Sequence, residues 1–259
     1  MPRPINLAKA RILLSNDDGI NAPGFAVLEK STRALSKDIW VVAPESEQSG
    51  ASHSLTLHRP LRLHKLGPRR FSVDGTPTDS VLLAINRIMA GCKPDLVLSG
   101  INRGGNLGED ISYSGTVAAA MEATILGVPA VALSLIAEDA ASAKWKTAVT
   151  HLPRVLKGLA SVGWPSSVFI NVNFPDVPAD KVTGIRVTQQ GRRKLGDELI
   201  ERKDPRGRSY FWIGMMRMEE EAKPGTDLAA VNEAAISVTP AYLSLTPGPM
   251  LRRLKTAFP

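Results

Sequence analysis

One stretch near the N-terminus, residues 11–19 with the sequence RILLSNDDG, constrains the fold of this chain more than any other. A short apolar run is followed at once by polar residues and a glycine, which is typical of a buried parallel strand that ends in a tight turn. In an open α/β sheet, ligands bind at the carboxyl ends of the strands. We therefore expect Asp17 and Asp18 to lie at a ligand-binding edge of a sheet.

Asp17 and Asp18 are adjacent carboxylates, and they repel each other unless a positive group lies between them. A divalent cation is the usual positive group, and carboxylate oxygens suit hard ions such as Mg²⁺, Mn²⁺ or Ca²⁺. The turn taken alone leaves a second interpretation open, in which it is a solvated acidic turn that caps the next helix.

The order of elements predicts a parallel sheet. Residues 22–36 place Phe25, Leu28 and Leu35 on one face at helical spacing, and residues 38–43 form a second apolar strand. A strand, a helix and a strand in succession make a parallel sheet the default. Further strands are predicted at residues 95–99, 130–135, 168–173 and 235–239, with helices at 76–88, 117–126, 140–158 and 250–255 and short antiparallel strands at 55–57, 61–63 and 71–73.

The character of the chain changes after Pro178. Residues 185–187 and 210–213 are strand-like, and the segment between them has few apolar residues. We predict that they form the two arms of a long hairpin, which is rarely stable alone and packs on a partner subunit. The alternative is a hairpin folded back on its own core. The expected organisation is one domain, residues 1–259, with a core at about 11–178 and an extension at about 179–259.

Polar clusters follow several of the predicted strands. Residues 48–53 are rich in small polar side chains, residues 100–108 contain four glycines, and residues 114–116 (SGT) open a helix. A helix start offers free N–H groups and a positive dipole end, which suit a phosphate. Each cluster alone has a plainer interpretation: a surface loop, a turn and an ordinary N-cap. Because parallel strands end at one edge, we expect the clusters to converge, and a metal beside a phosphate site suits phosphate-ester chemistry.

The composition excludes several classes of protein. The chain of 259 residues has a single cysteine, Cys92, which rules out a disulfide framework and indicates a reducing cytoplasm. No apolar stretch approaches the roughly 18 residues of a membrane helix. The net charge of +7 leaves nucleic-acid binding open as an alternative function. A non-catalytic sensor of metal and nucleotide is a further alternative. Against nucleic-acid binding, aromatic residues make up only 5%, and the basic stretch 192–208 also carries Asp197, Glu198, Glu201 and Asp204.

Taken in order, these motifs resemble the SurE family, the survival-protein 5'/3'-nucleotidases. The resemblance spans nearly the whole chain from Arg11, and the order and spacing of its motifs are highly specific. The matching segments are residues 15–19, 22–24, 42–44, 48–52, 75–79, 99–102, 106–108, 113–116, 226–227 and 237–240. The chain differs from many relatives at Ala241, Tyr242 and Ser244, where they carry leucine, histidine and aspartate.

The resemblance implies a fold and an activity. The fold is α/β, with a Rossmann-like, mostly parallel sheet, helices on both faces, and a C-terminal β-hairpin and oligomerisation extension that exchanges elements between subunits of a homodimer or homotetramer. The activity is that of a divalent-metal-dependent phosphomonoesterase acting on nucleoside 5'- and 3'-monophosphates. The resemblance also allows short oligonucleotides or polyphosphate as substrates. Beyond these, we expect no nucleic-acid partner and no membrane partner.

The resemblance also implies a set of site residues. One Mg²⁺ or Mn²⁺ ion per subunit, or Ca²⁺ in crystals, is expected at the metal ligands Asp17, Asp18, Ser49 and Asn102. The two aspartates are also the expected catalytic residues, and whether one acts as base or as nucleophile stays open. The expected phosphate-binding residues are Asn106, Ser114, Gly115 and Thr116.

Overall fold

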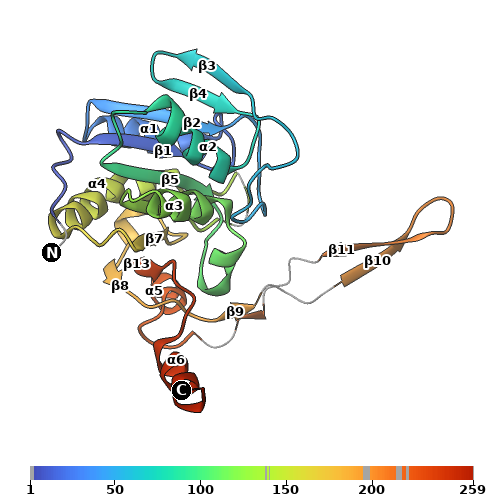
Figure 1. The fold of residues 1–259 in the computed structure, drawn as a ribbon. Helices are drawn as coiled ribbons and strands as arrows, with labels where there is room; N and C mark the ends of the chain where they lie inside the picture. The colour runs from blue at the N-terminus through green and yellow to red at the C-terminus, as the bar shows by residue number, and fades with distance from the viewer. Residues whose placement is uncertain are drawn as a thin grey trace.

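The computed structural model describes residues 3–137, 139, 141–194, 199–213, 218–219 and 222–258. Its strands are β1 Arg11–Ser15, β2 Asp38–Pro44, β3 Leu63–Gly67, β4 Arg70–Val73, β5 Leu96–Arg103, β6 Ala130–Leu135, β7 Val168–Phe174, β8 Gly184–Val187, β9 Arg193–Lys194, β10 Leu199–Lys203, β11 Ser209–Ile213, β12 Met218–Glu219 and β13 Ala235–Tyr242. Within these described residues, nine strands form one sheet in the order β3-β4-β2-β1-β5-β6-β7-β13-β8 (Figure 1). Its neighbours are parallel except for the β3–β4 and β7–β13 pairs, which confirms the predicted mostly parallel sheet.

Helices cover both faces of this sheet, as predicted. They are α1 Pro23–Arg33, α2 Pro77–Leu83, η1 Ala84–Ile88, η2 Gly108–Ser112, α3 Gly115–Ile125, α4 Trp145–Val162, η3 Ala179–Lys181, α5 Asp227–Asn232 and α6 Gly248–Ala257. One buried apolar cluster joins Phe25 of α1 to Leu152 of α4, and a second joins Val81 of α2 to Val117 of α3. The helices α1 and α4 therefore lie on one face, and α2 and α3 lie on the other.

The strand order reverses beside β1. The chain leaves β1 through α1 to reach β2 on one side, whereas β5 pairs with β1 on the other side, with Ser15 opposite Ser99. In open α/β sheets the ligand crevice lies at such a switch point, outside the carboxyl ends of the strands. The turn that carries Asp17 and Asp18 follows β1, and Asn102 lies near the end of β5, so these residues lie at this crevice.

Two consecutive crossovers have opposite hands. The helices α3 and α4 each carry the chain one strand further in the same direction, from β5 to β6 and from β6 to β7, but they lie on opposite faces. Such crossovers are right-handed in about 98% of cases, so a pair of opposite hand is unusual. The consequence is local: Trp145, the first residue of α4, lies beside the start of α1 and not on the face of α3.

Two predicted strands in the segment before α2 are wrong. Residues 55–57 and 61–62 form no strand, and β3 begins only at Leu63. The reason is a competing hydrogen-bond partner, because the backbone N–H and the hydroxyl of Thr56 donate to the Asp79 carboxylate at 3.1 and 2.6 Å. The predicted strand at 71–73 is present in β4, but β4 also pairs in parallel with β2 and so extends the main sheet.

The predicted hairpin uses a different first arm. Residues 185–187 belong to β8, which pairs in parallel with β13 inside the main sheet. The hairpin is formed by β10 and β11, with Glu201 opposite Phe211, and it projects away from the sheet (Figure 1). Its turn is closed by Asp204, whose carboxylate accepts from the backbone N–H groups of Arg206 and Arg208 at 2.8 and 2.9 Å. Charged residues in 199–203 (LIERK) mask this strand in the sequence, and the predicted hairpin residues Asp197 and Glu198 lie outside the described residues.

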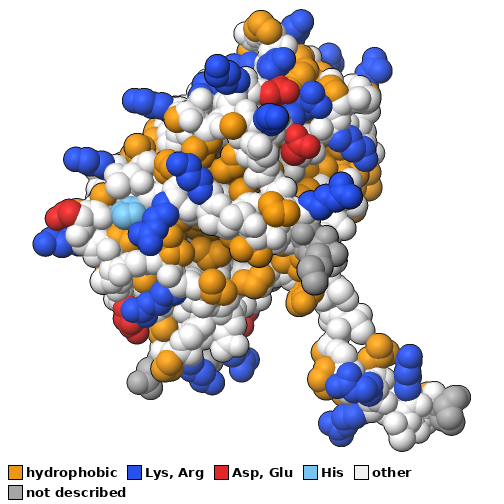
Figure 2. Space-filling view, turned by 90° about the vertical axis from the view of Figure 1, so that its left-hand side faces the viewer, with side chains coloured by type: hydrophobic (Ala, Val, Ile, Leu, Met, Phe, Trp, Pro, Cys, Tyr) orange, Lys and Arg blue, Asp and Glu red, His pale blue; other side chains and the backbone are white. Residues whose placement is uncertain are grey.

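The C-terminal part of the chain exposes apolar side chains. In β11, Phe211 and Ile213 are 61% and 79% exposed, and α6 has no buried residue. Figure 2 shows α6 as the lobe that projects at the lower right, with hydrophobic and basic side chains both at its surface. Among the helices of the described residues, none combines the length and the apolar character that crossing a membrane requires. The division of the chain at residue 178 stays a prediction.

Candidate active site

The turn after β1 is fixed by its own polar groups and by the loop after β2. The side-chain amide of Asn16 donates to the carbonyl oxygen of Gly19 at 2.8 Å. Gly19 has a φ of +92°, and a Cβ there would lie 3.1 Å from the carbonyl carbon of Ser46, so glycine suits this position on both counts. The backbone N–H of Gln48 donates to the carbonyl oxygen of Asp17 at 2.8 Å. The loop that carries Ser49 is therefore held against the aspartate turn.

Asp17 faces the start of α3. Its side chain is buried and accepts a hydrogen bond from the Thr116 hydroxyl. A Cβ on Gly115 would lie 2.7 Å from the Cβ of Asp17 and 2.9 Å from its Oδ2, so the glycine makes room for the carboxylate. Burial raises the pKa of Asp17 above its ordinary value, and hydrogen bonds from the side chain and backbone of Thr116 oppose that rise.

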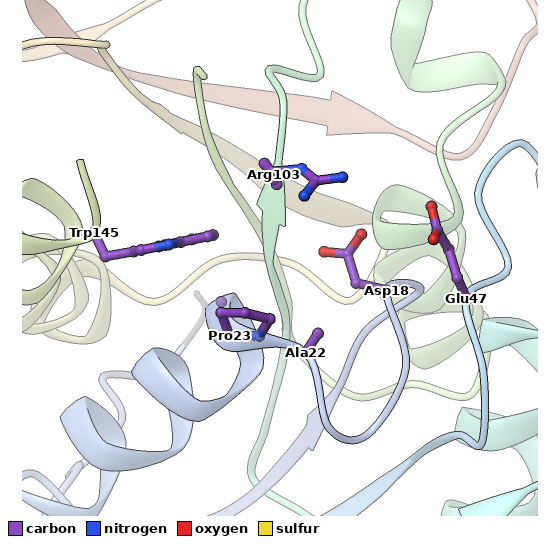
Figure 3. A pocket seen from close by; sticks show the side chains of 7 residues that line it. Asp18, Ala22, Pro23, Glu47, Arg103 and Trp145 are labelled. Atoms are coloured by element: carbon purple, nitrogen blue, oxygen red, sulfur yellow. The ribbon is translucent and has the colours of Figure 1, made fainter. Parts of the chain in front are cut away.

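Asp18 lies on the other side of the turn, in a pocket with Glu47 and Arg103 (Figure 3). Burial, followed by the charge of Asp17, raises the pKa of Asp18 to about 7, and a hydrogen bond from the Arg103 backbone opposes the rise. Arg103 directly follows Asn102, whose side-chain N–H₂ donates to the carbonyl oxygen of Gly104 at 2.7 Å. This leaves the amide oxygen of Asn102 as its group suited to a cation.

The four positions expected to bind metal thus meet at one edge of the sheet. Asp17 contacts the neighbour of Ser49, and Asp18 contacts the neighbour of Asn102. The Ser49 hydroxyl donates to the Glu47 carboxylate at 2.9 Å, and the charge of Glu47 raises the pKa of both aspartates. Negative charge is therefore concentrated here, as the sequence predicts.

The donor chemistry fits a hard divalent ion. Buried Asp17 and half-buried Asp18 keep raised pKa values even though the charge of Arg103 opposes the rise at Asp18, and within the described residues the buried amide oxygen of Asn16 has no hydrogen-bond partner. The described part of the chain contains no group of three or more His, Cys, Asp or Glu side chains arranged to hold a metal. A metal here would therefore need neutral oxygens beside the two carboxylates, and serine and asparagine supply them. Such all-oxygen sites suit Mg²⁺ or Mn²⁺.

The polar side chains at the start of α3 make hydrogen bonds within the protein in this structure. Ser114 is the N-cap, and its hydroxyl accepts from the backbone N–H of Val117 at 3.1 Å. This is the plainer interpretation that the sequence leaves open. The Thr116 hydroxyl donates to Asp17. Gly115 lies between them, beside the carboxylate. Phosphate binding by these three residues stays a prediction, and the positive dipole end of α3 is the feature that favours it.

Asn106 is held in a buried asparagine network. Its backbone N–H donates to Oδ1 of Asn173 at 2.8 Å, and its carbonyl oxygen accepts from Nδ2 of Asn171 at 2.8 Å. Its own side-chain Nδ2 donates to the Ser134 hydroxyl at 2.8 Å. Sequence reasoning missed these partners, although two asparagines in the otherwise apolar strand β7 are a signal of a buried polar network. The network fixes the position of Asn106.

Three further residues beside Asp18 were also missed: Glu47, Arg103 and Trp145. Arg103 carried a signal, because it is the only charged residue in the glycine-rich stretch 100–108. No sequence feature identified Trp145, because nothing in the local sequence places it beside a turn that lies more than a hundred residues earlier.

Family comparison decides the relationship of this chain to known proteins. The family model described as Survival protein SurE matches residues 12–197, which is well over half of the chain. The chain belongs to the SurE family. The resemblance noted in the sequence is thereby confirmed, together with the fold class.

Individual SurE relatives extend the match to nearly the whole chain. The 5'-nucleotidase SurE of Paramagnetospirillum magneticum is 62% identical over 248 residues, covering 96% of this chain and 95% of the relative. The 5'-nucleotidase SurE of Rhodospirillum rubrum is 54% identical and covers 98% of each chain. The crystal structure of the SurE protein from Aquifex aeolicus matches with a TM-score of 0.83 and 39% identity, covering 96% of this chain and 99% of that one. The SurE architecture therefore includes the segment after residue 197.

Proposed function

We propose that this chain is a 5'-nucleotidase that hydrolyses nucleoside 5'-monophosphates to nucleoside and phosphate. The names of SurE relatives with 62% and 54% identity support the reaction class. The observation that carries the proposal is the pair Asp17 and Asp18 at the switch point of the sheet, with one carboxylate at the start of α3 and the other in an open pocket. Hydrolysis of 3'-monophosphates belongs to the same proposal and is tested by replacing AMP with 3'-AMP.

The proposal includes one Mg²⁺ or Mn²⁺ ion held by Asp17, Asp18, Ser49 and Asn102. When bound, such an ion supplies Lewis-acid polarisation of a phosphoryl oxygen and lowers the pKa of a coordinated water. The chain's own residues orient the substrate. The N–H groups and the dipole at the start of α3 favour the negative charge of a phosphoryl group, with Ser114 and Gly115 closest to that end. The asparagine network holds Asn106 at the same edge of the sheet.

Chelation tests the metal requirement. We expect AMP hydrolysis with Mn²⁺ or Mg²⁺, loss of turnover in excess EDTA, and recovery when Mn²⁺ is restored, because two adjacent carboxylates at this turn repel each other unless a cation lies between them. The measurement is phosphate release. Turnover that survives full chelation would contradict the metal, and absence of turnover with either ion would contradict the function. Tight DNA binding with a steep salt dependence and no AMP turnover would instead support the nucleic-acid alternative.

Assembly is the second proposal. We expect a homodimer or homotetramer, because the apolar side chains of β11 and α6 are exposed in a single chain. Light scattering after gel filtration at micromolar concentration measures the mass. Trp212→Glu places a charge among these side chains and is expected to lower the mass, whereas Arg206→Glu in the hairpin turn serves as a control that keeps it. A monomeric parent protein would refute the prediction.

A further inference from the structure

A second part of the crevice adjoins Asp18 on the side away from α3. It is a pocket of about 170 Å³ between the turn after β1 and the starts of α1 and α4. In Figure 3, Trp145 and Pro23 lie on one side of it and Asp18 and Glu47 on the other, with Arg103 extending across the top. Nothing in the proposed metal and phosphate chemistry uses Trp145 or Pro23. The pocket therefore needs an explanation of its own.

The indole of Trp145 is held firmly at one edge. A Cβ on Gly24 would lie 2.7 Å from its Cη2 and 2.9 Å from its Cζ3, so only glycine lets the ring lie this close to the start of α1. Trp145 is half-buried and packs against the core beneath α1 and α4. The part of the ring that lines the pocket is therefore a rigid apolar surface, fixed in place before any ligand arrives.

Arg103 supplies the polar side of the pocket. It is the last residue of β5, and both its backbone and its charge lower the pKa of Asp18, so its guanidinium extends from the strand end beside that carboxylate. A guanidinium is planar, stacks on rings, and donates several hydrogen bonds in one plane. A small pocket with an aromatic ring on one side and a guanidinium at its top is suited to a flat heterocycle with acceptor atoms at its edge.

We propose that this pocket is the nucleobase subsite of the substrate, with Trp145 stacking on the base and Arg103 bonding its edge. The proposal rests on the proposed 5'-nucleotidase function, and it names the part of the site that reads the nucleoside. Its volume is smaller than the roughly 300–1,000 Å³ of a site for a complete drug-sized ligand, which fits a base alone. The phosphoryl group would then lie on the α3 side of the aspartate turn, and the base would lie on the α1 side.

The opposite hands of the two crossovers explain how the subsite arises. A helix from β6 to β7 on the same face as α3 would carry Trp145 away from α1. Because α4 lies on the face of α1, the ring reaches Gly24 and Asp18. The phosphate and base regions consequently occupy opposite sides of the sheet edge, and the two aspartates lie between them.

The test compares AMP with ribose 5-phosphate, which lacks the base. The measured quantity is the ratio of kcat/KM for AMP to kcat/KM for ribose 5-phosphate. Stacking on an aromatic side chain is worth about 1–3 kcal/mol per base, so Trp145→Ala should lower the ratio by roughly 5- to 150-fold. Trp145→Phe keeps an aromatic face and should retain most of the ratio. Trp164→Phe, which alters a tryptophan just past the other end of α4, is the matched control.

Arg103→Gln keeps the test decisive if Trp145→Ala does not fold, because it should lower the same ratio without opening a hole in the core. An unchanged ratio in both Trp145→Ala and Arg103→Gln, with AMP turnover intact in the parent, would overturn the subsite and leave the proposed function standing. A parent protein that hydrolyses ribose 5-phosphate but not AMP would overturn both. The parent measurement therefore separates the two failures before any variant is made.

Discussion

Asp17→Asn and Asp18→Asn are each expected to lower AMP turnover by roughly 10²-fold or more and to weaken Mn²⁺ binding, with the fold retained. Each exchange keeps the shape of the side chain and removes a negative charge that a hard cation requires. Steady-state kinetics and calorimetric Mn²⁺ titration measure the two effects, and circular dichroism checks the fold. Asp180→Asn is the matched control, because it removes an exposed carboxylate that does not line the Asp18 pocket. Parent-like Mn²⁺ binding in both variants would show that these carboxylates are not ligands.

Although Asp18→Asn should lower activity, it should raise the stability of the metal-free protein. The pKa of Asp18 is about 7 in the folded protein and 3.8 in the reference state. Between those values the folded state binds more protons than the unfolded state, so the free energy of unfolding falls as pH rises. At pH 8 in EDTA, Asp18→Asn removes this loss and should be more stable than the parent by roughly 2–4 kcal/mol. Urea unfolding at pH 4 and pH 8 measures it, and equal pH dependence in parent and variant would contradict the assignment.

Gly115→Ala is expected to lower kcat/KM by roughly 10²-fold, since misplacement of a catalytic group by about 1 Å can cost that much. The added methyl would lie 2.7 Å from the Cβ of Asp17 and 2.9 Å from its Oδ2, closer than packed atoms approach. Either the Asp17 side chain or the start of α3 must move. Mn²⁺ affinity should fall together with activity, which separates displacement of Asp17 from loss of a phosphate contact alone.

Gly158→Ala is the matched control for Gly115→Ala. It is the same exchange, at a position in α4 where a Cβ meets nothing within 4 Å. Alanine favours a helix interior by roughly 0.5–1 kcal/mol over glycine, so this variant should be fully active and slightly more stable. Equal activity of the two variants would show that Asp17 tolerates a side chain at position 115.

Local sequence determined the strands and turns at which the candidate site lies. The step from apolar to polar residues at 11–19 fixes a strand end, and the hydroxyl of Thr76 and the carboxylate of Asp79 form the capping box that starts α2. The convergence of three polar clusters also followed from sequence, because the carboxyl ends of parallel strands share one edge. These features depend on residues close together in the chain or on a general rule of sheet topology.

Tertiary structure alone decided which partners each element meets. Residues 185–187 form a strand as predicted, but their pairing with β13 depends on residues about fifty positions away. The Thr116 hydroxyl donates a hydrogen bond to Asp17, which lies 99 residues earlier in the chain. Asn106 is held by hydrogen bonds with Asn171 and Asn173 on β7. The position of Trp145 depends on the hand of one crossover. Side-chain periodicity specifies what each element buries, whereas the partner is chosen by packing between distant segments, which no local pattern records.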